Sequence, residues 1–432
     1  MAQRRTPSSP ALERAALVGL VSGPSRRSDA ERSLDELAGL AAAAGARVEI
    51  RMLQERPKPD PATFIGRGKV ASLAAACAEA HIDLVVFDNE LTPAQLRQLE
   101  DALGRKVVDR TQLILDIFAR RARTREGKAQ VELAQLKYLL PRLAGAGAAL
   151  SRLGGGIGTR GPGETKLETD RRRIRDRIAA IQKAIDQVRQ RRAQARERRH
   201  KQSVPVVALV GYTNAGKTTL FNRLTDAHAV ASDALFVTLD PLVRQVRLPD
   251  ARELRLSDTV GFVDRLPHAL VAAFRATLEE VVDADLLLHV IDASSPDCER
   301  HIAAVHRVLE EVGAREVPAI EVYNKIDALD AEDRRRLAET SPDAALISAR
   351  TGEGVAALLA ALTGRLELDT RRLMLEFDAN TPEARRRIAH VYQVGRVLSH
   401  ENRGGRVVIE AEVPRRCIDR LTGPMPAEAA GA

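Results

Sequence analysis

The chain has 432 residues, which is too long for one ordinary hydrophobic core and predicts roughly two to four domains. Its formal net charge of +8 favours an anionic partner without identifying one. The cysteines Cys77, Cys298 and Cys417 are far apart and match no CxxC pattern, which excludes a disulfide framework or cysteine metal site and fits a reducing cytosol. No stretch is apolar enough for a transmembrane helix, and the short run AALVGLV indicates a strand rather than a signal peptide.

We expect residues 1–15 to be disordered. In residues 16–110, short segments typical of strands alternate with longer segments typical of helices. AALVGLV, ARVEIRML, DLVVFDN and KVVD have the composition of strands, whereas RSLDELAGLAAAAG and KVASLAAACAEA have that of helices. This alternation predicts a small α/β domain at the N-terminus.

Residues 111–202 are predicted to form a helical hairpin. Residues 111–143 form one long helical segment, a second follows a glycine-rich stretch, and both carry apolar residues at intervals of three and four. Helices with matching apolar seams and a short link pack as an antiparallel pair. The seam residues are Leu133, Leu136, Leu140 and Leu143 in the first helix and Ile174, Ile178, Ile181, Ile185 and Val188 in the second.

The outer faces of this hairpin are strongly basic. From Asp170 to Lys201 there are thirteen Lys or Arg residues against four Asp or Glu, a local net charge of +9. A solvated coiled-coil face is one interpretation, but such faces normally mix both signs, so we favour contact with nucleic-acid phosphates. No aromatic residues are interleaved, which argues against base stacking.

A glycine-rich tip, residues 151–166, joins the two helices. Six residues of LGGGIGTRGPGET are glycine, so the tip is either a disordered linker or a narrow point at which the backbone approaches packed RNA. Beside basic helices we favour the second interpretation. The candidate RNA contacts are Arg152, Arg160, Lys166, Arg171, Arg172 and Arg173.

The strongest motif is a phosphate-binding loop. VPVVALVGYTNAGKTTLFNRLT is an apolar strand, a GxxxxGKT loop and a helix, which is the context that this motif requires. The loop's backbone N–H groups can surround phosphate oxygens, Lys217 adds a charge at the β- and γ-phosphates, and Thr218 can bind Mg²⁺. The loop residues are Gly211, Tyr212, Thr213, Asn214, Ala215, Gly216, Lys217, Thr218 and Thr219.

Two further motifs are predicted to be nucleotide-sensing switches. Thr238, in FVTLDP, can offer a hydroxyl to Mg²⁺, and Asp258, in LSDTVGF, follows a strand-like run and can hold Mg²⁺ through water. The predicted switch residues are Thr238, Asp240, Asp258, Thr259, Val260 and Gly261. Phe262 occupies the position at which many small GTPases place a water-orienting Gln, so the water-positioning residue is unknown. Phe262 is either the cause of slow intrinsic turnover, a core anchor, or both.

EVYNKID and ALISAR predict that the bound base is guanine. The Asp327 carboxylate can accept hydrogens from N1–H and the 2-amino group of guanine, whereas adenine lacks both. The guanine-binding candidates are Asn324, Lys325, Asp327, Ser348, Ala349 and Arg350. Residues 203–368 are therefore expected to form a GTP-binding domain.

The expected fold class is α/β. A P-loop GTPase domain with a mostly parallel sheet and flanking helices is preceded by the small α/β domain with its helical hairpin. A small α+β domain over 369–423 follows, because RLMLEF and RVVIEAEVP indicate strands and PEARRRIAHVYQVG a helix. Residues 424–432 are expected to be a disordered tail.

The sequence resembles the HflX family of ribosome-associated translational GTPases, within the Obg-like TRAFAC class of P-loop GTPases. PDPATFIGRGK, VVDRTQLILDIFARRARTREGK, VELAQLKYLLPRL and GGGIGTRGPGETKLETDRRRI carry the resemblance outside the nucleotide motifs, and it covers roughly residues 15–370. It assigns residues 211–219 to the phosphate loop, Thr238 to the first switch, 258–261 to the second, and Asn324, Lys325 and Asp327 to base recognition. Asp264, in GFVDRLP, departs from the family pattern but removes no ligand.

The resemblance implies GTP-dependent binding to the large ribosomal subunit and its RNA, slow hydrolysis that the ribosome stimulates, and splitting of stalled or idle ribosomes under stress. It also implies Mg²⁺ as cofactor and a cytoplasmic location, in part peripheral at the membrane without insertion. The seams can pair internally, so we expect a monomer. Two alternatives are an ATP-fuelled enzyme that remodels ribosomal RNA and a GTP-gated large-subunit assembly factor. Asp327 and the lack of a second phosphate loop argue against ATP.

Overall fold

The computed structural model consists of two compact units. The first holds residues 1–188, 230–240 and 260–278, and the second holds 189–229, 241–259 and 279–432. The residues that the structure describes are 12–23, 27–151, 162–200, 204–225, 227, 235–236, 238, 242–249, 253–264, 278–367, 370–378, 381–403, 405–414, 418 and 421.

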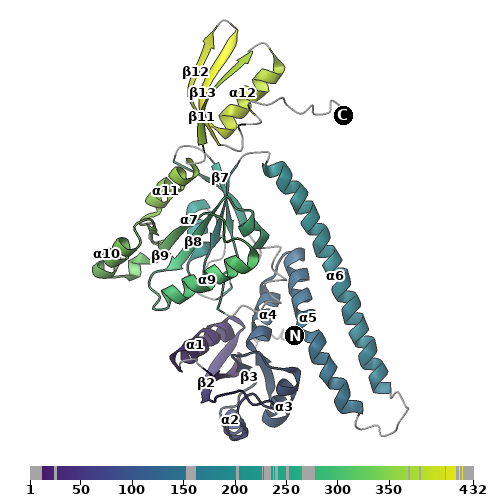
Figure 1. The fold of residues 1–432 in the computed structure, drawn as a ribbon. Helices are drawn as coiled ribbons and strands as arrows, with labels where there is room; N and C mark the ends of the chain where they lie inside the picture. Colours follow the sequence, from purple (N-terminus) through teal and green to yellow (C-terminus); the bar gives the residue numbers. More distant parts are fainter. Residues whose placement is uncertain are drawn as a thin grey trace, which may run out of the picture. The chain divides into compact units, whose positions relative to one another are not determined.

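The first unit contains a four-stranded parallel sheet with the strand order β2-β1-β3-β4 (Figure 1). All four residues of β3 are buried, as expected for a strand covered on both faces, and the four strands predicted here are confirmed. The elements are β1 (Glu13–Val21), α1 (Arg27–Ala43), β2 (Ala46–Glu55), α2 (Arg67–Glu79), β3 (Leu84–Phe87), α3 (Pro93–Leu103) and β4 (Lys106–Asp109).

The helical segment 111–143 is two helices, so the prediction of one long element is wrong. The helix α4 (Arg110–Arg121) ends where Ala122 adopts an extended backbone, and α5 (Arg125–Ser151) begins just beyond. The Thr124 hydroxyl accepts a hydrogen bond from the Gly127 N–H at 2.9 Å, which satisfies a donor in the first turn of α5. The extended backbone at Ala122 and the cap at Thr124 therefore divide into two helices a segment whose sequence is helical throughout.

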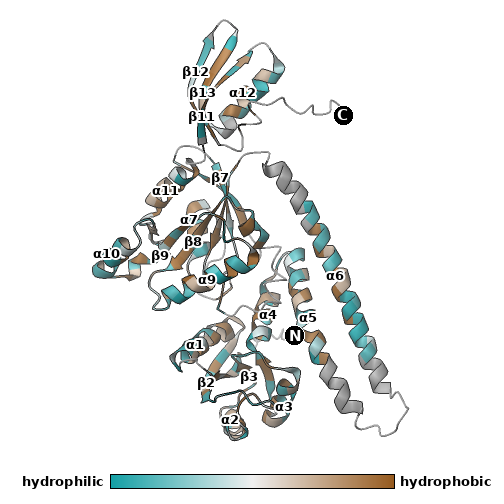
Figure 2. Ribbon diagram, in the orientation of Figure 1, coloured by the Kyte–Doolittle hydropathy of each residue, from teal (hydrophilic) through white to brown (hydrophobic). Residues whose placement is uncertain are grey.

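The hairpin of α5 and α6 (Pro162–His200) is closed by an apolar seam. The cluster contains the predicted seam residues Leu133, Leu136, Ile178, Ile181 and Ile185 together with Ala129. The predicted seam residues Leu140, Leu143, Ile174 and Val188 do not belong to it. The described part of α6 is largely hydrophilic on its other faces (Figure 2). The helices extend into the region predicted as tip, since α5 reaches Ser151 and α6 begins at Pro162; residues 152–161 lie outside the described residues.

The second unit contains a six-stranded sheet with the order β10-β9-β8-β5-β7-β6, in which only β6 runs antiparallel to its neighbour. Its core is aliphatic, with Phe221 as the one buried aromatic side chain of that cluster. The elements are β5 (Val206–Val210), α7 (Lys217–Thr225), β6 (Leu242–Arg247), β7 (Glu253–Asp258), β8 (Leu286–Asp292), α9 (Cys298–Val312), β9 (Ala319–Asn324), η1 (Ile326–Ala328), α10 (Ala331–Thr340), β10 (Ala345–Leu346) and α11 (Val355–Glu367).

A three-stranded antiparallel sheet, β11-β13-β12, follows, with α12 contributing to its core. The predicted strands and helix are confirmed as β11 (Thr370–Asp378), β13 (Arg406–Pro414) and α12 (Pro382–Val394), and β12 (Arg396–Arg403) is an additional strand. The C-terminal segment expected to be disordered, 424–432, lies outside the described residues, as do residues 1–11. The first strand, β1, begins at Glu13, inside the segment 1–15 that was expected to be disordered. Among the described residues, no helix has both the length and the apolar character needed to cross a bilayer.

Candidate nucleotide-binding site

The phosphate loop connects β5 to α7 and depends on two glycines with positive φ. Gly211 has φ +152° and Gly216 has φ +93°. A Cβ at Gly211 would lie 2.2 Å from the Val290 carbonyl oxygen, and one at Gly216 would lie 2.2 Å from Nδ2 of Asn324. Only glycine fits either position, because neighbouring elements press directly on the loop backbone. The loop precedes the N-terminus of α7, where backbone N–H groups and the helix dipole favour an anion.

The side chain of Lys217 folds back onto the first residues of the phosphate loop. Its side chain is only 6% exposed, and Nζ donates to the carbonyl oxygens of Gly211 at 3.1 Å and Tyr212 at 2.7 Å. Burial lowers the pKa of Lys217 to about 8, so the ammonium is still charged at neutral pH. The charge is therefore held inside the loop, where a phosphate oxygen could replace the two carbonyls.

Thr218 and Asp258 form a pair of oxygen donors at the ends of α7 and β7. The Thr218 hydroxyl donates to Oδ2 of Asp258 at 2.9 Å, and Asp258 is fully buried. A hydroxyl and a carboxylate are the hard donors that Mg²⁺ prefers, so the chemistry of this pair fits the ion.

Asn324, at the end of β9, joins three loops. It is 2% exposed, its Nδ2 donates to the Ala215 carbonyl at 2.8 Å, and its Oδ1 accepts from the Ala349 N–H at 2.8 Å. The phosphate loop and the segment 348–350 are therefore fixed relative to the NKID loop by one amide.

Asp327 is held ionised and oriented by its neighbours. The Ser348 hydroxyl donates to it at 2.6 Å, and Arg350 forms an ion pair with its other oxygen. The hydrogen bond from Ser348, followed by the charge of Arg350, holds the pKa of Asp327 below its usual value despite partial desolvation. Lys325, in the left-handed region with φ +66°, donates to Asp292 at 2.7 Å. The predicted base-reading residues thus lie together.

Two residues of this site were missed from sequence. Asp292 ends β8 beside Asn324 in register, and its place at the carboxyl end of a central parallel strand was the available signal. Arg223, on α7, donates to the Ala349 carbonyl at 3.2 Å and also to the Arg350 carbonyl. Its partners are 126 and 127 residues away, so no local pattern indicated the contact.

Of the other predicted switch residues, Thr259 belongs to the second unit, where it is buried and its hydroxyl donates to the Leu209 carbonyl. Thr238, Val260 and Gly261 belong to the first unit, and Asp240 lies outside the described residues. Phe236, two residues before Thr238, packs edge-on against Phe118 of α4, with 4.6 Å between ring centroids.

The side chain of Phe262 is fully buried, which supports the interpretation of this residue as a core anchor. Within the first unit, Arg110 at the start of α4 donates to Asp88 at 2.9 Å, pairs with Glu36 and donates to the main-chain carbonyl of Asp264 at 3.3 Å. This contact reaches the segment that follows the predicted second switch, and sequence reasoning did not find it.

The RNA-contact candidates are only partly described. Arg171, Arg172 and Arg173 lie on α6, and Arg173 pairs with Asp170 at 3.5 Å. Lys166 belongs to the first turns of α6, but its side chain lies outside the described residues, as do Arg152 and Arg160 entirely.

Three family descriptions match successive parts of the chain. "GTP-binding GTPase N-terminal" matches residues 31–119, "GTP-binding GTPase Middle Region" matches 121–199, and "50S ribosome-binding GTPase" matches 206–325.

The chain is also similar to individual proteins. A relative from Caldanaerobacter subterraneus subsp. tengcongensis, named GTPase HflX, is 48% identical over 95% of this chain and 93% of its own length. The protein named GTPase HflX from Escherichia coli (strain K12) is 46% identical over 88% of this chain and 89% of its own length. The crystal structure of a GTP-binding protein from Sulfolobus solfataricus in complex with GDP aligns with 82% of this chain and 98% of its own at 24% identity and a TM-score of 0.44.

Proposed function

Because this chain belongs to the HflX family of GTPases, we propose that it is a GTP-gated factor that binds the large ribosomal subunit and splits stalled or idle ribosomes under stress. The observation that carries the nucleotide part is the oriented Asp327 carboxylate, held by Ser348 and Arg350 where it can accept two hydrogens from guanine. The 50S ribosome-binding description of residues 206–325 supports the ribosomal part.

In this proposal, residues 211–219 surround the phosphates and Lys217 exchanges its carbonyl partners for phosphate oxygens. Thr218 and Asp258, the latter through water, would hold Mg²⁺, with Thr238 as the predicted further ligand in the GTP state. The ion would supply positive charge that neutralises the negative charge developing on the phosphates. Phe262 cannot orient water, so turnover is slow in the free protein and the ribosome completes the site.

The hairpin supplies the ribosomal RNA contact. The net charge of +9 between Asp170 and Lys201 supports a phosphate-binding role for α6, and the seam of α5 and α6 gives that surface a rigid support. We propose the divisions 16–110, 111–202, 203–368 and 369–423 as domains, and a monomer that acts in the cytoplasm.

The test is sedimentation of intact ribosomes through a sucrose gradient with the protein and GTP, a non-hydrolysable GTP analogue or GDP. Separate subunits with either triphosphate, but not with GDP, are the expected result, and hydrolysis then only resets the factor. Addition of ATP alone should leave ribosomes whole.

Ribosomes that stay whole in every lane would contradict splitting and favour an assembly factor, whereas splitting with ATP alone would favour the remodelling enzyme. Single-turnover hydrolysis with and without ribosomes separates a stimulated GTPase from a non-catalytic GTP-gated scaffold.

A further inference from the structure

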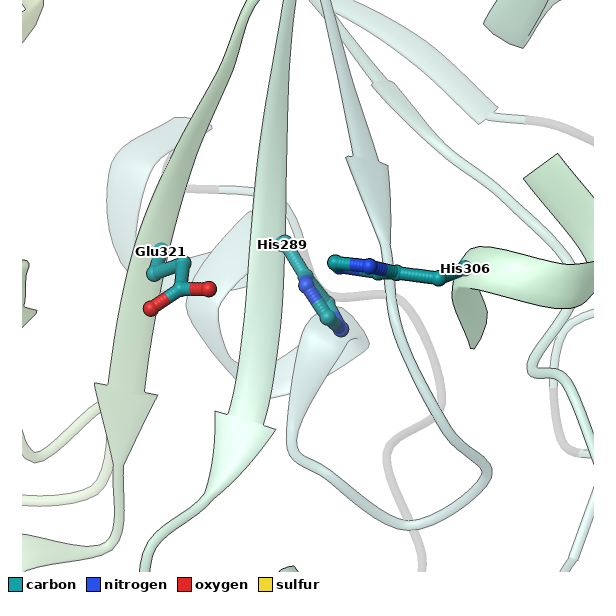
Figure 3. A group of neighbouring side chains, drawn as sticks. All are labelled: His289, His306 and Glu321. Atoms are coloured by element: carbon teal, nitrogen blue, oxygen red, sulfur yellow. The ribbon is translucent and has the colours of Figure 1, made fainter. Parts of the chain in front are cut away.

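A cluster of three metal-binding side chains lies on the face of the GTPase sheet that α9 covers. His289 comes from β8, Glu321 from the neighbouring strand β9, and His306 from α9 (Figure 3). His289 and Glu321 are partners in the parallel register, so their side chains leave the same face of the sheet. One ligand atom from each of the three residues lies within 4.8 Å of the other two.

Both imidazoles are available as ligands. The rings are neighbours, with centroids 5.4 Å apart and planes 48° apart, and within the described part of the chain neither makes a hydrogen bond. His289 is 3% exposed, so its ring lies inside the layer between the sheet and α9. His306 is exposed and opens the cluster to solvent.

We propose that His289, His306 and Glu321 bind one divalent transition-metal ion, with Zn²⁺ as the best match, at a site separate from that of Mg²⁺. Two imidazoles and one carboxylate form a well-known zinc ligand set, whereas Mg²⁺ prefers oxygen donors alone. Ligand bonds of about 2.0–2.1 Å in tetrahedral geometry place donor atoms roughly 3.3 Å apart. The ligand atoms of the cluster lie within 4.8 Å of one another, so they need to approach by at most about 1.5 Å. The exposed His306 and the half-buried Glu321 can make that movement while buried His289 stays fixed.

Such an ion would link α9 to two central strands of the sheet. Val290, next to His289, has its carbonyl against the first glycine of the phosphate loop, and Tyr212 in that loop stacks on His301 of α9 at a centroid distance of 3.9 Å. The metal would therefore stiffen the structure on which the phosphate loop rests, without contacting the nucleotide.

The experiment is titration of the metal-free full-length protein with Co²⁺, whose visible absorption reports tetrahedral nitrogen and oxygen ligation, followed by displacement with Zn²⁺. We expect one ion per chain in the unaltered protein. His306→Ala should weaken binding at least about ten-fold, because loss of a ligand should cost no less than loss of its outer hydrogen-bond partner. Glu321→Gln should weaken binding in the same way, and it keeps the shape of the side chain.

His301→Ala is the matched control, since it removes a histidine from the same helix outside the cluster and should bind the ion unchanged. Absence of the visible bands in the unaltered protein, or equal affinity in all four proteins, would overturn the proposal. Guanine nucleotide affinity is measured in parallel on the metal-free proteins. It should be the same in the unaltered protein and in both ligand variants, because neither residue belongs to the proposed nucleotide site, and equal affinity establishes that the variants fold.

Discussion

Ser348 and Arg350 hold both oxygens of Asp327, the residue proposed to recognise guanine, and so fix the orientation of its carboxylate. Those two residues follow β10 in the sequence, and Asn324 fixes the same segment through the Ala349 N–H. Little conformational freedom is left to lose when guanine binds, which favours affinity and selectivity together.

Asp327→Asn should exchange guanine for xanthine specificity. An amide donates where the carboxylate accepts, so it pairs with the C2 carbonyl of xanthine and leaves the 2-amino group of guanine unpaired. We expect GTP affinity to fall at least about a hundredfold and XTP to bind better than GTP, as measured with fluorescent nucleotide analogues. Asp330→Asn is the matched control, since Asp330 only caps α10 and Asn caps equally well. Equal losses in both variants would refute base reading by Asp327.

Nucleotide affinity should fall as the pH rises above about 8, the pKa of Lys217 in the nucleotide-free loop. Below that pH the lysine is already charged, whereas above it binding must first add a proton, at a cost of up to tenfold in affinity for each pH unit. Dissociation constants for GDP from pH 7 to about 8.8 measure this slope. Lys217→Ala should bind weakly and with a flat profile, and a slope that persists in that variant would assign the titration to another group.

The motifs of the proposed nucleotide site could be recognised residue by residue, because each motif is local in sequence. The contacts of Asn324 with Ala215 and of Arg223 with Ala349 were not, because each joins segments more than a hundred residues apart. The His289 cluster was not predicted either, because its three ligands come from three different elements, β8, α9 and β9, and match no local ligand spacing.

At the scale of elements, apolar runs and their periods identified all four strands of the first sheet, but boundaries depended on caps. The break between α4 and α5 comes from Ala122 and the Thr124 hydroxyl, inside a run whose composition is helical throughout. The strand β12 was missed because RVLSHENR is mostly polar, as suits an edge strand that pairs only with β13.

Arg110→Ala should loosen the first unit. Asp88 and Glu36 would lose the cation that neutralises them in a buried setting, a change of about 3–5 kcal/mol in comparable pairs. Faster amide hydrogen exchange in α1 and β3 of the full-length protein is the expected result. Arg27→Ala, which removes an exposed pair with Glu31, should leave exchange unchanged. Equal exchange in both variants would contradict the structural importance of Arg110.

Replacement of Arg171, Arg172 and Arg173 by Gln should flatten the salt dependence of ribosome binding. Each arginine that contacts a phosphate contributes about one to the slope of log affinity against log salt, so the slope should fall by up to about three. The measurement is binding to large subunits at several salt concentrations. Arg334→Gln, on α10, is a control whose slope should match the unaltered protein.

The GTPase domain and the hairpin tip should have separable roles. Replacing residues 154–163 by a Ser-rich linker should leave GTP affinity intact and weaken ribosome splitting, because a bulkier tip cannot approach packed RNA as closely. Gradient sedimentation and nucleotide titration on the same preparation measure both. Undiminished splitting by the swapped protein would show that the tip is only a connector.

The contact between Phe236 and Phe118 gives this chain a spectroscopic use. The sequence contains no tryptophan, so Phe236→Trp would introduce a single indole fluorophore. Position 236 lies two residues before Thr238, and its side chain packs against the Phe118 ring of α4. Its emission is blue-shifted while the ring is buried and moves to longer wavelength when water reaches it. One optical signal would then follow the predicted first switch in each nucleotide state, on and off the ribosome, without an attached dye.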